Sequence, residues 1–187
     1  GDYIIFKITD IPRFTIDQIT RHEIGTFKNV QSFRYVDKDN FAYEIPKEIE
    51  DNNDLVTRYI VYMTCVTQLY SDIQEYVLKK TNTKERANEQ ARYVLPMATH
   101  GALVMGFTVE ALIHFMHKRL CGRAEDIIRK LAIEMKKETL KYLPDLQEYL
   151  VPQCEYLLWC PEEKGNCGRY LQKKELKERL RNEKDII

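Results

Sequence analysis

The stretch NNDLVTRYIVYMTCVTQLYSDIQEYVLKK, residues 52–80, is the strongest helix signal in the chain. Its apolar residues recur at helical spacing, and Asn52 or Asn53 can cap its first turn. A second helix is predicted over residues 83–96, closing near Pro96. Helical patterns also cover residues 13–22, 108–120, 123–143 and 176–184. The chain is therefore predicted to be rich in helices.

Two apolar segments predict a small sheet beside these helices. DYIIFKI, residues 2–8, and THGALVMGF, residues 99–107, both have the composition of strands. Residues 23–44 predict a long functional loop, or a loop with short strands. The fold class is therefore predicted as α+β, a helix-rich single domain over residues 1–187. Its Cys-containing, charged C-terminal tail covers residues 152–187.

Composition narrows the function classes. The chain has 187 residues, 44% hydrophobic and 31% charged, with a formal net charge of zero. A nucleic-acid binder usually carries a basic surplus, so no nucleic-acid partner is predicted. No apolar run approaches the roughly 20 residues of a membrane span, and no secretory signal stands at the start. The odd number of cysteines fits a reducing compartment, so a cytoplasmic location is predicted.

RHEIGTFKNVQSFRY, residues 21–35, gathers phosphate-type donors around one acid, Glu23. These donors are Arg21, His22, Ser32 and Arg34. The rigid fork of arginine suits phosphate better than lysine does. The alternative is a salt-bridged surface loop, which spacing alone favours.

Three more arginines are candidate anion ligands. Arg92 lies one turn before a helix stop, and Arg119 and Arg123 lie on either side of a helix break. A helix starting at Arg123 would add backbone N–H groups that favour an anion. The alternative for all three is helix capping and surface ion pairing.

Metal and nucleophile signals lead to no assignment. His114 and His117 have a spacing that can share a metal, but no third ligand of the right type follows nearby. Cys154, Cys160 and Cys167 form C-x5-C-x6-C, which is not the tight pair typical of zinc, and their role stays open. The sequence has no G-x-S-x-G, P-loop or GxGxxG pattern. No metal is predicted.

The motifs together, in this order, resemble the flavin-dependent thymidylate synthases, in particular clostridial-type members. The resemblance covers about residues 3–169. It is carried by Arg21-His22-Glu23 followed by Ser32-Phe33-Arg34-Tyr35, by EQARYVLP, by ALIHFMHKRLCGRAEDIIRKLA and by the Cys-rich CEYLLWCPEEKGNCGR.

The resemblance implies a reaction, methylation of dUMP at C5 to give dTMP. It implies methylenetetrahydrofolate as carbon donor, FAD as hydride donor and NADPH as the reductant of the flavin. It also implies a homotetramer with sites between subunits. Arg119 would be catalytic, lying against the uracil and favouring its ionised form. The motif positions place dUMP against Gln18, Arg21, Ser32, Arg34, Arg92 and Arg119, and FAD against His22, Glu23 and His114.

This sequence also departs from the family pattern. Glu23 and Glu110 stand where the family has arginine, Thr108 where it has asparagine, and Glu125 where it has glutamine. The sequence begins at or just after the position of the family's upstream E-H pair. A carboxylate near a diphosphate is repulsive, and reversing a charge in a partly desolvated site costs several kcal/mol. Weak FAD binding by this chain alone is therefore predicted.

Three functions follow from these patterns. The first is a flavin-dependent thymidylate synthase. The second is a non-catalytic subunit or pseudoenzyme that keeps a nucleotide site but has lost normal FAD binding. The third is a changed enzyme of pyrimidine C5 chemistry that uses another cofactor. Two questions stay open: whether a full-length paralogue supplies the flavin contacts, and whether the substrate is dUMP or another pyrimidine nucleotide. The alternative for Glu23 and Glu110 is that both form surface ion pairs, with Arg21 or Lys118.

Overall fold

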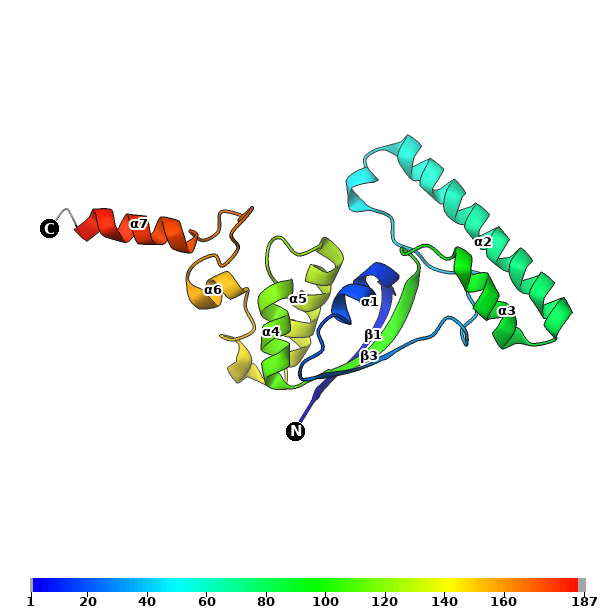
Figure 1. Ribbon diagram of the computed structural model, residues 1–187, viewed down its shortest axis with the longest axis horizontal. Helices are drawn as coiled ribbons and strands as arrows, with labels where there is room; N and C mark the ends of the chain where they lie inside the picture. The colour runs from blue at the N-terminus through cyan, green and yellow to red at the C-terminus, as the bar shows by residue number, and fades with distance from the viewer. Residues whose placement is uncertain (1, 185–187) are drawn as a thin grey trace. The chain divides into compact units, whose positions relative to one another are not determined.

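The computed structural model describes residues 2–184 and confirms the α+β class (Figure 1). Three strands, β1 (Ile4–Pro12), β2 (Thr26–Val30) and β3 (His100–Phe107), form one sheet in the order β1-β3-β2. Both predicted strands are present, and β1 continues to Pro12. Strand β2 lies inside the region predicted as a loop with short strands.

The contacts along β3 show that both of its neighbours run antiparallel to it. At one end Arg13 N donates to Thr99 O at 2.9 Å, and at the other end the rings of Phe6 and Phe107 lie 6.0 Å apart. Residues later in β1 therefore pair with residues earlier in β3, so the two strands are antiparallel. On the other side, Gln31 N donates to Ala102 O, and Thr108 N donates to Gly25 O, each at 2.9 Å.

The chain divides into two compact units. The unit called here the central unit comprises residues 7–21 and 28–105. The unit called here the C-terminal unit comprises the described residues of 1–6, 22–27 and 106–187. Each unit contains part of all three strands.

The central unit contains α1 (Arg13–Ile19), α2 (Asn53–Thr81) and α3 (Lys84–Ala91). Helix α2 matches its prediction, and the Asn52 side chain caps it by accepting from Leu55 N at 3.1 Å. Its buried residues Met63 and Val66 pack with Phe41 in a hydrophobic cluster.

Two predicted helices of the central unit are shorter than expected. Helix α1 ends at Ile19, not at His22, and residues 20–21 form a turn. Helix α3 ends at Ala91, after which Arg92–Val94 form one 3-10 turn. Leu95 is already extended because the residue before a proline disfavours the helical conformation.

The C-terminal unit contains α4 (Val109–Arg119), α5 (Asp126–Leu140), α6 (Gln153–Leu157) and α7 (Lys173–Lys184). Helix α4 buries Leu112, Phe115 and Met116 completely. Helices α4 and α7 contain their predicted segments apart from the helix ends, whereas α6 was not predicted.

The prediction that a helix begins at Arg123 is wrong. Helix α5 begins at Asp126, and Glu125 is its cap. The Glu125 carboxylate accepts from Ile127 N at 3.0 Å and from Ile128 N at 3.2 Å. A carboxylate therefore occupies the helix end that was expected to attract an anion. Among residues 2–184, no helix is long and apolar enough to cross a membrane.

Candidate functional site

The residues predicted to bind ligands fall into both units. Gln18, Arg21, Ser32, Arg34 and Arg92 belong to the central unit. His22, Glu23, His114 and Arg119 belong to the C-terminal unit. Each unit has its own cavity among these residues.

The cavity of the central unit brings Ser32 and Arg92 together across 60 positions of sequence. Ser32 lies on the loop that leaves β2, and Arg92 lies in the turn that follows α3. The cavity is open and has a volume of about 580 Å³. Its lining comprises Arg13, Val30, Gln31, Ser32, Phe33, Arg92, Tyr93, Leu95, Pro96 and Met97.

Arg92 is the lining group best suited to an anion. Its side chain is half-buried, and no carboxylate pairs with it among the described residues. The other lining arginine, Arg13, is paired with Asp17 at 3.3 Å and lies over the Phe33 ring. Arg92 therefore keeps a charge that no carboxylate offsets among the described residues, in a cavity that Ser32 also lines, and this combination suits a phosphate.

Arg13, Phe33 and Tyr93 also line this cavity, and no sequence pattern had marked them as ligands. Arg13 opens α1 directly after Pro12, and no motif spacing marks it as a ligand. By contrast Gln18 and Arg21, which motif position selected, are not among the lining residues. Arg21 is exposed in the turn after α1.

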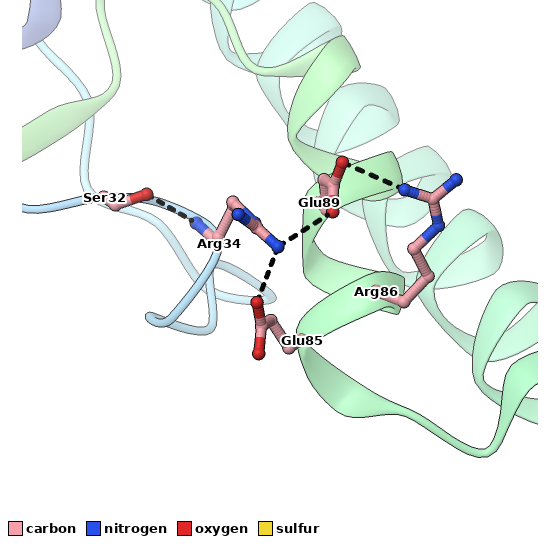
Figure 2. A network of polar contacts seen from close by, with 5 residues as sticks. All are labelled: Ser32, Arg34, Glu85, Arg86 and Glu89. Atoms are coloured by element: carbon pink, nitrogen blue, oxygen red, sulfur yellow. Dashed lines mark hydrogen bonds and ion pairs between the residues drawn. The ribbon is translucent and has the colours of Figure 1, made fainter.

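Arg34 is also absent from the cavity lining and is held by helix α3 instead. Its Nη2 lies 2.6 Å from Glu85 Oε1 and 3.3 Å from Glu89 Oε2 (Figure 2). The second carboxylate also pairs with Arg86 at 3.0 Å. The Ser32 hydroxyl accepts from Arg34 N at 3.3 Å.

In the C-terminal unit, Arg119 contacts His22 directly. Arg119 Nε donates to His22 Nε2 at 3.1 Å. An arginine nitrogen is only a donor, so His22 Nε2 is the acceptor and the imidazole proton lies on Nδ1. The His22 ring centroid is 5.0 Å from that of Phe115 and 6.1 Å from that of His114.

The turn that carries His22 is fixed by backbone contacts. The Thr26 hydroxyl donates to His22 O at 2.8 Å. Gly25 adopts a φ of 67°, and a Cβ there would lie 2.7 Å from Thr108 Oγ1. Only glycine fits both the conformation and this close approach. The turn therefore holds His22 against helix α4.

A second cavity, of about 350 Å³, adjoins Arg119 and His22. Four of the five cysteines line it, and burial raises the pKa of the Cys154 thiol. Among residues 2–184, no three His, Cys, Asp or Glu side chains are grouped closely enough to hold a metal ion. The lining comprises His22, His117, Lys118, Arg119, Cys121, Arg123, Ala124, Gln153, Cys154, Cys160, Pro161, Glu162 and Cys167.

Glu23 and Glu110 are both exposed, and neither has an ion pair within the described part of the chain. The alternative considered for these acids, surface ion pairs with Arg21 or Lys118, is therefore wrong. Glu110 lies in the first turn of α4, where the helix dipole favours a carboxylate. This position explains why the helix tolerates an unpaired acid there.

The residues assigned to flavin suit the aromatic ring system of the cofactor but not its diphosphate. The imidazoles of His22 and His114, beside Phe115, offer ring faces and polar nitrogens that fit an aromatic ring system. The unpaired carboxylates of Glu23 and Glu110 do not fit a diphosphate, because like charges repel.

Comparison with known proteins shows what this chain is similar to. The family model described as thymidylate synthase complementing protein matches residues 3–145. A flavin-dependent thymidylate synthase of Nitratidesulfovibrio vulgaris is 38% identical, over 88% of this chain and 67% of the relative. A flavin-dependent thymidylate synthase of Clostridium tetani is 33% identical, over 91% of this chain and 71% of the relative. A flavin-dependent thymidylate synthase of Pyrococcus abyssi is 30% identical, over 84% of this chain and 64% of the relative.

The fold defines the class, a helix-rich α+β protein built on a small antiparallel sheet. The family model covers most of the chain, and two relatives above 30% identity are covered over at least two thirds of their length. The chain therefore belongs to the thymidylate synthase complementing protein family, the family of the flavin-dependent thymidylate synthases.

Proposed function

We propose that this chain is a flavin-dependent thymidylate synthase that converts dUMP to dTMP. Methylenetetrahydrofolate is the carbon donor, and NADPH is the source of reducing equivalents. Family membership supports this activity over a purely non-catalytic role, since the matched relatives bear that name.

The observation that carries the proposal is the cavity shared by Ser32 and Arg92. The guanidinium of Arg92 and the hydroxyl of Ser32, which line the same cavity, can bind the dianionic phosphate of dUMP. The apolar and aromatic lining, Phe33, Tyr93 and Pro96, offers surfaces for the remainder of the nucleotide. Gln18 and Arg21, which do not line the cavity, stay predictions as nucleotide ligands.

Arg119 is proposed as the catalytic residue. A fixed cation against the uracil favours the ionised, negatively charged form of the ring, and that form is the better nucleophile at C5. The guanidinium remains protonated at all relevant pH values. The contact from Arg119 Nε to His22 Nε2 fixes one edge of the guanidinium, so its orientation is set before substrate arrives.

His22 and His114 are the groups proposed to contact FAD. Bound reduced FAD supplies the hydride. The chain's own contribution is to hold the two imidazoles, 6.1 Å apart, beside the buried Phe115 ring. Glu23 and Glu110 are proposed to weaken this binding.

The test is direct binding of dUMP by calorimetry. Arg92→Ala should weaken binding by about tenfold or more, since a hydrogen bond to a charged group contributes roughly 1.5–3 kcal/mol. The control is Arg58→Ala, an exposed arginine on α2 that lies outside the cavity lining. Absence of heat at millimolar dUMP, or unchanged affinity in Arg92→Ala, would contradict the nucleotide site.

Catalysis is tested separately, by dTMP formation with dUMP, methylenetetrahydrofolate, NADPH and added FAD. Arg119→Ala should abolish turnover while leaving dUMP binding measurable. A variant that turns over at the rate of the unmodified chain would remove Arg119 from the mechanism.

A further inference from the structure

Four of the five cysteines meet in the cavity that adjoins Arg119, and we call this group the thiol cluster. It comprises Cys121, Cys154, Cys160 and Cys167. The four come from three segments of the C-terminal unit: the turn after α4, helix α6 and the loop that leads to α7. Cys65, by contrast, lies on α2 in the central unit. The proposed reaction uses none of these thiols, so it does not explain why four of them converge.

The thiol cluster suits a bond between two thiols better than a metal site. Within residues 2–184, no three His, Cys, Asp or Glu side chains are close enough to share a metal ion. A disulfide needs only two thiols, on residues whose Cα atoms lie about 4.4–6.8 Å apart. The pair that forms it must be adjacent, and one of its members must be open to an oxidant.

Adjacency selects Cys167 and Cys121. A Cβ on Gly122 would lie 3.6 Å from Cys167 Sγ and 3.8 Å from Cys167 Cβ. Because Gly122 has no side chain, the Cys167 thiol lies against the backbone of the turn, one residue from Cys121. Cys121 is therefore the thiol nearest along the chain to the contact that Cys167 makes.

The loop that carries Cys167 is also fastened to the turn that carries Cys121. Arg123 lies in this turn, and its Nη1 donates to Lys164 O at 2.7 Å. The same nitrogen lies 3.4 Å from Glu162 Oε2. These contacts hold the loop beside the turn, so the two thiols stay close without a covalent bond between them.

Exposure selects the thiol that reacts first. Cys167 is exposed and Cys121 is half-buried, whereas Cys154 and Cys160 are each only 8% exposed. Burial raises the pKa of the Cys154 thiol, so that thiol stays protonated and unreactive. The cavity is also lined by three cations, Lys118, Arg119 and Arg123. Their charge attracts an anionic oxidant such as glutathione disulfide to the exposed thiol.

We propose that Cys121 and Cys167 are a modification site, at which a small-molecule disulfide oxidises the two thiols to an intramolecular disulfide. The Cys167 thiolate attacks one sulfur of glutathione disulfide, forms a mixed disulfide and releases one glutathione thiolate. The Cys121 thiolate then attacks the Cys167 sulfur and releases the second glutathione thiolate. Two protein thiols are oxidised, one glutathione disulfide is reduced to two glutathiones, and these take up the two thiol protons.

The new bond ties the loop to the helix end that carries the proposed catalytic residue, because Cys121 follows Arg119 by two positions. The modification therefore reports an oxidising environment at the cavity beside Arg119. Disulfide formation requires neither dUMP nor FAD, so its failure would leave the proposed function untouched.

Peptide mapping by mass spectrometry tests the pair. The reduced chain is incubated with glutathione disulfide near neutral pH, the remaining thiols are alkylated, and the chain is digested. We expect one cross-linked peptide pair, which joins Cys121 to Cys167. Cys65, an exposed thiol outside the cavity, is the internal control and should keep its mixed disulfide with glutathione. The mixed disulfide at Cys167 should stay below about a tenth of that at Cys65, because a neighbouring thiol resolves it at high effective concentration.

Two variants separate the roles of the thiols. In Cys121→Ser the cross-link should disappear, and Cys167 should keep glutathione as Cys65 does. Cys160→Ser is the matched control from the same cavity, and its cross-link should form within about twofold of the rate in the unmodified chain. Circular dichroism shows whether each variant is folded, and the map of the unmodified chain identifies the pair without any variant.

Three results would overturn the proposal. One is a cross-link that involves Cys154 or Cys160 in place of the proposed pair. Another is a Cys167 that keeps glutathione in the unmodified chain to the same extent as Cys65. The third is a thiol cluster that resists alkylation in the untreated chain until EDTA is added, because that pattern shows a bound metal ion.

Discussion

Two exposed carboxylates, Glu23 and Glu110, stand in segments that the family resemblance assigns to flavin. Each lacks an ion pair in the described part of the chain, so its negative charge is not offset by a neighbour. Both charges would repel the diphosphate of FAD. The combined effect is testable because both side chains are on the surface and their replacement disturbs no core packing.

Replacing both acids by Glu23→Arg with Glu110→Arg should raise FAD affinity by about tenfold or more, since 1.4 kcal/mol is one decade. The gain should shrink at high salt because exposed charges are screened. Fluorescence quenching of the flavin measures both effects. Glu134→Arg, an exposed acid on α5, is the control for net charge. If the double variant binds FAD no better than the control, charge at these positions does not limit binding.

Protonation of His117 makes the free energy of unfolding depend on pH. Burial lowers its pKa below the usual 6.5, and the nearby His114 and Lys118 lower it further, whereas a hydrogen bond with the Tyr149 backbone raises it. The unfolded chain therefore binds more protons than the folded chain just below pH 6.5. The contribution of neutral His117 to stability is fully present above that pH and is lost as the pH falls from there through the lowered pKa of the folded state.

We expect the unfolding midpoint to fall when the pH is lowered from about 7.5 to about 5.5, and to fall less in His117→Asn. Asparagine keeps a donor for the Tyr149 backbone but does not titrate. Equal pH dependence in His117→Asn and the unmodified chain would show that His117 is not responsible.

Helix α2 shows how one side chain fixes an element's start. The sequence allowed either Asn52 or Asn53 as the cap, and the structure assigns the role to Asn52, which accepts from Leu55 N. Asn53 is the first helical residue. Only the residue before the helix has the extended backbone that lets its side chain turn back onto the first free N–H groups.

Asn52→Ala should lower the free energy of unfolding by about 1 kcal/mol, whereas Asn53→Ala should change it little. For a chain of this size the first change corresponds to roughly 2–4 °C in the unfolding midpoint. Calorimetric unfolding of the two variants compares them directly. A larger loss for Asn53→Ala would reverse the assignment.

At the scale of the whole molecule, one apolar face of helix α2 is exposed. Leu55, Tyr62, Leu69 and Tyr76 recur every seven residues and are 39%, 53%, 48% and 66% exposed. The neighbouring face of the same helix is buried at Met63, Val66 and Tyr70. An apolar stripe of this period is typical of helices that pack against a partner helix. We therefore propose that this stripe forms the contact between copies of the chain in an oligomer.

Tyr62→Glu with Leu69→Glu should dissociate the oligomer, because burying two unpaired charges in an apolar contact is unfavourable. Sedimentation velocity at micromolar concentration measures the change. Thr64→Glu, exposed on the same helix away from the stripe, should leave the assembly intact. A monomer in the unmodified chain would exclude this contact.

The sequence by itself determined the elements and the family. Helical periodicity located α2 and α4, and two apolar runs located β1 and β3, because burial of one face leaves a repeat that is visible in the residue order. The ordered motifs identified the family that the comparisons confirm. The helix ends were less accurate: α1 and α3 were predicted too long and α5 too early, since caps and the residue before a proline decide where a helix ends.

Only the tertiary structure decided how the selected residues are used. It brought Ser32 and Arg92 into one cavity with Arg13, a residue that no spacing could select. It joined Arg34 to Glu85 and Glu89 across about 50 positions, and Arg119 to His22 across 97. The physical reason is that the charge an arginine offers to a ligand depends on the carboxylates folded against it. Local sequence patterns do not contain those long-range pairings.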